Sequence, residues 1–157
     1  MSATSSSPLE LLIVEDGDEY LENLSRFIDG VRFTQAHHAR SAIDCLNQQS
    51  IDVIYLDMRF DRIPGDELVG DYQEVLKRYQ GDHDRARRHL QNNQGLYILS
   101  EFERAGYDKV PTVLAYDFRR EKKRLEILKR QHPQLHWVPD TIAAVDIREL
   151  LFSLRPG

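Results

Sequence analysis

Hydrophobic residues along this chain follow two alternating patterns, and each pattern predicts a different kind of secondary structure. Residues 9–14 and 51–56 are short, almost continuously apolar runs, which is typical of strands buried on both faces of a parallel sheet. Three further short segments have strand character, at 31–36, 110–115 and 135–138. The chain is therefore expected to contribute five strands to a buried sheet.

Between these strands, hydrophobic residues recur at the three- and four-residue spacing of amphipathic helices. Gly30 ends the first helix, whose stripe consists of Tyr20, Leu21, Leu24, Phe27 and Ile28. Four more helices are expected, at residues 39–46, 95–105, 118–131 and 142–154. Five strand–helix repeats predict an α/β fold built as a doubly wound parallel sheet.

One long polar segment interrupts this alternation after the third strand. It contains a charged stretch at 82–93, preceded by a helical stripe of Leu68, Tyr72, Val75, Leu76 and Tyr79. We interpret the segment at about 61–94 as an inserted helical hairpin, too small and too polar to form a domain of its own. The expected organisation is a loose polar tail at 1–8 and a single domain at 9–157.

Composition narrows the classes of protein that the chain can represent. Its 157 residues, 41% hydrophobic and 30% charged, are typical of one globular domain. The formal net charge of -5 gives no reason to expect a nucleic-acid partner. The single cysteine, Cys45, excludes an internal disulfide, and no apolar run is long enough to insert into a membrane. The chain start lacks the apolar stretch of a secretory signal, so a cytoplasmic location is expected.

Acidic side chains follow two of the predicted strands at the point where each strand ends. Glu15 and Asp16 come directly after the first strand, and Asp57 comes directly after the third. Ligands of doubly wound sheets bind beyond the carboxyl ends of the strands, so neighbouring strands would bring these three carboxylates into one pocket. Clustered carboxylates repel each other, and a hard divalent cation such as Mg²⁺ relieves that repulsion. A carboxylate beside Mg²⁺ can also act as a nucleophile toward phosphorus.

Three segments resemble the response-regulator receiver domains of two-component signalling. LLIVEDGDEYLENL (11–24) is similar to their first strand, acidic pair and first helix, and IDVIYLDM (51–58) to their third strand and phospho-acceptor. QGLYILSEFERAGYDKVPTVLAY (94–116) is similar to their third helix and fourth strand. Apart from the insert, the resemblance covers residues 9–155. It implies a flavodoxin-like sheet with strand order 2-1-3-4-5.

The resemblance also implies roles for individual residues. Asp57 would accept a phosphoryl group, Asp16 would bind Mg²⁺ directly, and Glu15 would bind it directly or through water. The backbone carbonyl of Arg59 would be a further metal ligand. These roles belong to a phosphorelay, in which the partner is a histidine kinase or a phosphotransfer protein.

Two positions depart from the receiver pattern. Receiver domains carry Ser or Thr at the end of the fourth strand, where this chain has Tyr116, or Ala115 if the register shifts by one residue. They also carry Lys before a proline at the end of the fifth strand, where Val138 precedes Pro139 here. Without that lysine, the pocket is expected to keep its cation but to hold a doubly charged phosphoryl group less well.

The favoured hypothesis is a stand-alone receiver-like signalling module, not an enzyme, that acts by binding other proteins. It would work either with Asp57 phosphorylated or as an atypical receiver that signals without phosphorylation. Besides a kinase or phosphotransfer protein, the partners would include a downstream signalling protein, with a homodimer as a further option. The basic helix at 118–131 is a candidate partner surface.

Two alternatives stay open beside this hypothesis. One is a Mg²⁺-dependent phosphotransfer or hydrolytic enzyme on a related sheet, although toprim-like nucleases and haloacid-dehalogenase-type phosphatases need a second aspartate where this chain has Arg59. The other is a scaffold whose acidic pocket is vestigial. A response of Trp137 fluorescence to Mg²⁺ would distinguish a working pocket from a vestigial one.

Overall fold

The computed structural model describes residues 7–156, and its sheet confirms the predicted topology. Most of the predicted tail at 1–8 therefore lies outside the described residues. All strands are parallel and lie in the order β2-β1-β3-β4-β5. The strands are β1 (Leu9–Val14), β2 (Val31–Ala36), β3 (Val53–Asp57), β4 (Thr112–Ala115) and β5 (Leu135–Val138). The order reverses between β1 and β3, which places the carboxyl ends of these two strands beside a ligand crevice.

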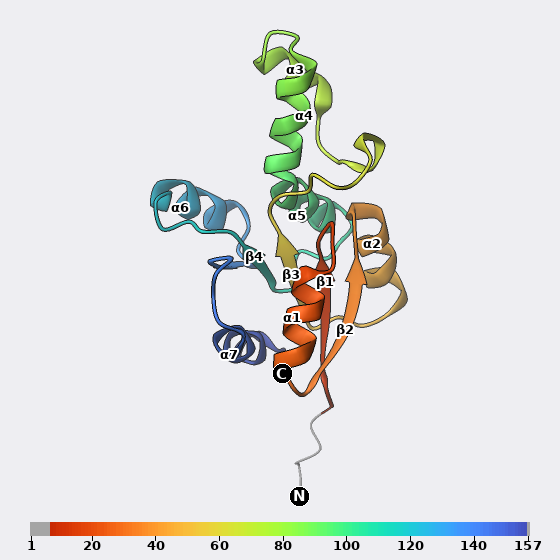
Figure 1. Cartoon of the computed structure of the whole chain (residues 1–157), viewed down its shortest axis with the longest axis vertical. Coiled ribbons are helices and arrows are strands. Elements are labelled where there is room, and N and C mark those ends of the chain that lie inside the picture. The colour runs from red at the N-terminus through yellow and green to blue at the C-terminus, as the bar shows by residue number, and fades with distance from the viewer. Residues whose placement is uncertain (1–6, 157) are drawn as a thin grey trace, which may run out of the picture.

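Helices cover both faces of the sheet, as in other doubly wound folds (Figure 1). One face packs against α1 (Glu19–Phe27) and α7 (Ala144–Leu154). The other face packs against α2 (Ala39–Gln48), α5 (Gln94–Arg104) and α6 (Lys122–Gln131). Because both faces are covered, successive β1 residues such as Ile13 and Val14 are fully buried on opposite sides, which explains the continuous apolar run.

Several element boundaries differ by a few residues from the sequence prediction, and two of the differences lie near the acidic residues. The helix expected at 118–131 begins only at Lys122, because the residues before it form a turn in which the Asp117 carboxylate accepts a hydrogen bond from the Arg119 amide at 3.0 Å. The third strand begins at Val53 and includes Asp57 as its last residue. Asp57 is therefore held by the sheet itself.

The insert forms a helical arm at one end of the molecule, away from the sheet (Figure 1). A short 3-10 helix, η2 (Gly65–Glu67), precedes α3 (Tyr72–Arg78) and α4 (His83–Asn92). Val75, Ala86 and Leu90 make a small core between α3 and α4. Only Asn93 separates α4 from α5, so the second helix of the arm leads directly into a helix that covers the sheet.

Gln94, at the start of α5, ties the segment before α3 to α4, and its replacement by alanine is expected to destabilise the protein. Its side chain is completely buried, accepts from the Val69 amide at 2.8 Å, and donates to the carbonyls of Val69 at 3.0 Å and Leu90 at 3.1 Å. Gln94→Ala removes all three hydrogen bonds and should lower the free energy of unfolding by about 2 to 4 kcal/mol. Urea unfolding followed by circular dichroism measures this, with the exposed Gln49→Ala as control. Equal losses in both variants would contradict the prediction.

Among residues 7–156, no helix is both long enough and apolar enough to cross a membrane.

Candidate functional site

Asp57 lies in a small cavity at the carboxyl ends of β3 and β4. The cavity has a volume of about 230 Å³ and is lined by Asp57, Met58, Arg59, Ala115, Tyr116, Asp117 and Asp140. The Asp57 Oδ1 atom accepts a hydrogen bond from the Met58 amide at 2.9 Å. Burial, reinforced by the charges of Asp16 and Glu15, raises the pKa of Asp57 to about 7. The carboxyl group therefore lies in an environment that disfavours negative charge.

The neighbouring strands offer Asp57 neither a free hydroxyl nor a positive charge. Ala115 lies directly opposite Asp57 in the β3–β4 register, and its side chain is a methyl group. Tyr116 lies one residue beyond the strand, and its hydroxyl donates to Glu121 instead. Val138 pairs with Ala115 and is buried against α7 in the apolar core. The groups that would contact a phosphoryl group in the receiver pattern are therefore absent from these positions.

The Glu15 carboxylate is turned toward the start of α1. It accepts hydrogen bonds at 3.0 Å from the amides of Tyr20 and Leu21, and at 3.1 Å from the side-chain amide of Gln35. Both carboxylate oxygens are used in these contacts, and the residue is only 1% exposed. Burial outweighs the hydrogen bonds and raises the pKa of Glu15. Glu15 thus caps the first turn of α1. The residue at the N-cap position, Asp18, makes no capping hydrogen bond with its side chain.

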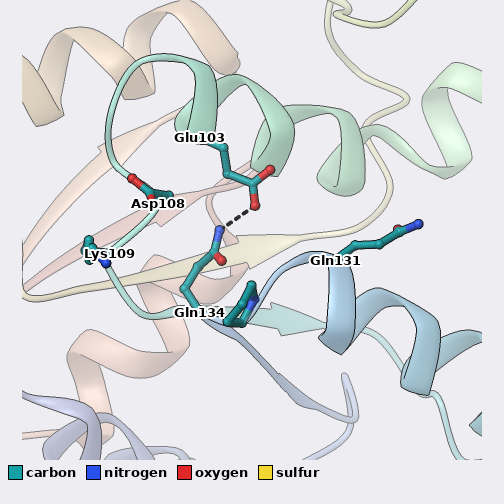
Figure 2. Close-up of a pocket in the computed structure, with 6 residues that line it drawn as sticks. Glu103, Asp108, Lys109, Gln131 and Gln134 are labelled. Atoms are coloured by element: carbon teal, nitrogen blue, oxygen red, sulfur yellow. Dashed lines mark hydrogen bonds between the residues drawn. The ribbon is translucent and has the colours of Figure 1, made fainter.

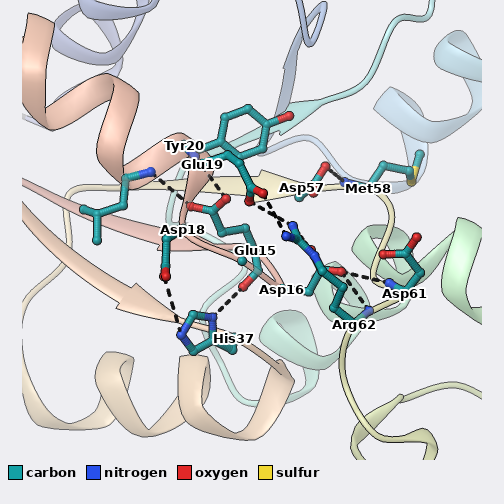
Figure 3. A network of polar contacts seen from close by, with 12 residues as sticks. Glu15, Asp16, Asp18, Glu19, Tyr20, His37, Asp57, Met58, Asp61 and Arg62 are labelled. Carbon is teal, nitrogen blue, oxygen red and sulfur yellow. Dashed lines mark hydrogen bonds and ion pairs between the residues drawn. The ribbon is translucent and has the colours of Figure 1, made fainter.

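The Asp16 carboxylate is engaged by the first residues of the insert (Figure 3). Its Oδ2 atom accepts from the amides of Asp61 at 2.9 Å and Arg62 at 3.0 Å, and its Oδ1 atom lies 3.1 Å from the Arg62 guanidinium. The same guanidinium forms two hydrogen bonds with Glu19, at 2.8 and 2.9 Å. Burial would raise the pKa of Asp16, but the hydrogen bonds and charge of Arg62 lower it. Asp16 is therefore an ion-paired carboxylate.

The predicted site residues are near one another but do not form one open ligand set. Asp57 and Arg59 share the cavity with Tyr116, whereas Glu15 and Asp16 do not line it. Within residues 7–156, no group of three or more His, Cys, Asp or Glu side chains is arranged to hold a metal ion. Because the oxygens of Glu15 and Asp16 already accept hydrogen bonds from the protein, the donor set in this conformation does not fit Mg²⁺, which needs carboxylate oxygens free to coordinate it.

Arg62 and Asp140 are among the charged residues at this end of the sheet that the sequence did not identify as site residues. Arg62 lies within the insert, where no local pattern distinguishes its guanidinium from those of the other surface arginines. Asp140 follows the fifth strand and Pro139 and adds a further carboxyl group to the cavity lining. Its position after a strand end is the same signal that identified Asp57, so the sequence did contain a clue to Asp140.

A larger cavity, of about 630 Å³, lies at the opposite edge of the sheet (Figure 2). It lies near the amino ends of β4 and β5 and is lined by Glu103, Asp108, Lys109, Gln131, Pro133 and Gln134. Glu103 contacts both His132 and Gln134 there, which links α5 to the turn before β5. These paired polar groups link two elements of the fold, and no residue that lines this cavity also lines the cavity of Asp57.

Comparisons with known proteins identify the fold by structure alone. No family model matches the chain, and no curated protein matches its sequence. The receiver domain of Francisella response regulator 1452 superposes with a TM-score of 0.62 at 12% identity, over 93% of this chain and 95% of that one. Chemotaxis response regulator CheY4 of Vibrio cholerae gives a TM-score of 0.58 at 14% identity, over 94% and 98%. The signal receiver domain of an HD domain-containing protein from Pseudomonas fluorescens gives 0.62 at 12%, over 98% and 90%.

Proposed function

We propose that this chain, which has the fold of response-regulator receiver domains, is a signalling module that acts by binding other proteins and not by turnover of a substrate. In this proposal Asp57 is the residue that can accept a phosphoryl group, but the switch that would respond to it is incomplete. The partners are a histidine kinase or phosphotransfer protein and a downstream signalling protein. Such a module belongs to the atypical members of this class of domain.

The observation that carries the proposal is the environment of Asp57. Its carboxyl group lies at the end of the central strand β3 and lines a cavity open to small ligands, as a phospho-acceptor requires. Asp117 and Asp140 add carboxyl groups to the cavity lining, and Val138, which pairs with Ala115, supplies no charge, so Arg59 is the one basic residue among those that line the cavity. A doubly negative phosphoryl group would therefore be poorly stabilised, which supports a switch with weak or no dependence on phosphorylation.

The exposed face of α6 supports an interaction role. Ile127 is 51% exposed on this helix, although it is a large hydrophobic residue. Basic side chains surround it on the same helix, in the sequence KKRLEILKRQ. A partial apolar surface with a basic rim fits a protein partner that carries acidic side chains.

Treatment with a small acyl phosphate, followed by intact-mass analysis, tests the role of Asp57. We expect wild type to carry only a small phosphorylated fraction and Asp57→Asn to carry none. A double variant, Ala115→Thr with Val138→Lys, supplies the missing hydroxyl and ammonium groups. It should be phosphorylated roughly tenfold faster, the effect of about 1.4 kcal/mol of added transition-state stabilisation.

Two results would contradict this proposal. Complete and rapid phosphorylation of wild type would show that the pocket is a conventional switch despite Ala115 and Val138. A phosphoryl group that persists in Asp57→Asn would show that another residue is the acceptor. Circular dichroism of the double variant establishes that it is folded before its rate is interpreted, because Val138 is buried.

A further inference from the structure

Arg62 contacts the acidic segment after β1 through both its side chain and its backbone amide. Its guanidinium pairs with Asp16 at 3.1 Å and with Glu19 at 2.8 Å, and its backbone amide donates to Asp16 at 3.0 Å. The Asp16 side chain is only 2% exposed, so it has lost nearly all contact with water. A buried carboxylate needs such a counter-charge, because an unpaired charge in this environment is strongly unfavourable.

The loop is shaped to receive this guanidinium. A Cβ atom at Gly17 would lie 2.4 Å from an Arg62 guanidinium nitrogen and 2.5 Å from its central carbon. Only a glycine leaves room for the guanidinium at this distance from the backbone. Gly17, Asp16 and Glu19 therefore form a fitted position for one planar cation, seen between Asp16 and Glu19 in Figure 3.

We propose that Arg62 is the built-in cation of the acidic pocket, and that it neutralises Asp16 in place of a divalent metal ion. The insert supplies this cation, so its first residues are part of the pocket and not a separate decoration. The two backbone donors, Asp61 and Arg62, fix the insert to the β1–α1 loop at the same point. Asp16 then has no free oxygen for a metal in wild type.

Manganese binding tests this proposal directly. Mn²⁺ prefers the same oxygen ligands as Mg²⁺, and the disappearance of its free aqueous signal in electron paramagnetic resonance reports binding. We expect Arg62→Gln, which frees Asp16 next to Asp57, to bind Mn²⁺ at least roughly tenfold more tightly than wild type. Adding Asp16→Asn to Arg62→Gln should return the affinity to the wild-type level. The measurement does not require Asp57 to be phosphorylated, so its failure is distinct from failure of the proposed function.

Arg78→Gln is the control. Arg78 pairs with Glu74 at 2.9 Å on α3 of the arm, so the variant removes the same charge without freeing a carboxylate at the end of the sheet. Equal gains in Arg62→Gln and Arg78→Gln would attribute the effect to net charge and overturn the proposal. Tight Mn²⁺ binding by wild type that Asp16→Asn abolishes would also overturn it.

A second variant keeps the proposal testable if Arg62→Gln fails to fold. Gly17→Ala displaces the guanidinium sterically while the charge of Arg62 stays in the chain. It should also increase Mn²⁺ affinity relative to wild type, and Gly65→Ala, where an added Cβ meets nothing within 4 Å, should not. No gain in a folded Gly17→Ala variant would count against the fitted cation position.

Discussion

Replacing Gly95 by alanine is expected to lower the free energy of unfolding by about 3 kcal/mol or more, since overpacking at this position meets backbone atoms, which cannot move aside, as well as one side chain. A Cβ atom at Gly95 would lie 2.4 Å from the Asp57 carbonyl oxygen and 2.9 Å from both the Met58 Cα and the Leu114 side chain. The Gly95 amide also donates to the Met58 carbonyl at 2.9 Å. The start of α5 must therefore move away from the end of β3, which carries Asp57.

Urea unfolding followed by circular dichroism measures this loss, and Gly65→Ala is the matched control. Gly65 lies in the insert, has no atom within 4 Å of an added Cβ, and should tolerate alanine within about 0.5 kcal/mol. Similar unfolding midpoints for the two variants would show that α5 does not pack this closely against β3. Because the displaced atoms belong to Asp57 and Met58, Gly95→Ala should also slow phosphorylation of Asp57 by the acyl phosphate.

Glu15→Ala is expected to lower the free energy of unfolding by about 2 to 4 kcal/mol, because it leaves three donors without their acceptor. Two of these donors are the amides of Tyr20 and Leu21 in the first turn of α1, and the third is the Gln35 side chain. The exposed Glu22→Ala, in the same turn of α1, removes a carboxylate that makes no such contacts and serves as the control.

Glu15→Gln separates the capping role from a metal-binding role. Glutamine keeps one of the two oxygens as an acceptor at the start of α1 and removes a buried charge, so we expect a smaller loss than for Glu15→Ala, about 1 to 2 kcal/mol. Mn²⁺ affinity in the Arg62→Gln background should be unchanged by Glu15→Gln if Glu15 only caps the helix. A large drop in that affinity would show that Glu15 is a metal ligand and would contradict the capping assignment.

The fold was predictable because it rests on local and repeated signals. A strand covered on both faces must be apolar at successive positions, so β1 and β3 were visible as runs such as the one ending at Val14. A helix that covers the sheet must repeat its apolar residues at helical spacing, which located α1 and α5. Asp57 was predictable for the same reason, because a carboxylate directly after a buried strand must lie at the edge where ligands bind.

The strand register, by contrast, required the tertiary structure. The sequence placed the Ser or Thr position of the receiver pattern at Tyr116, or at Ala115 if the register shifts by one residue. The β3–β4 pairing places Ala115 opposite Asp57, while the Tyr116 hydroxyl donates to Glu121 near the start of α6. A shift of one residue in a strand moves every side chain to the other face, and a four-residue strand contains too little pattern to exclude that shift.

The sequence by itself determined that this protein is a doubly wound sheet with acidic side chains at the carboxyl ends of β1 and β3. Only the tertiary structure decided how those side chains are used. Glu15 caps α1, and Asp16 pairs with Arg62, which lies 46 residues away in the chain. Periodicity reports which face of an element is buried, whereas the partner of a charged side chain depends on how distant loops meet in space. That is why the acidic pocket could be located from sequence, while its cation, an arginine of the insert, could not.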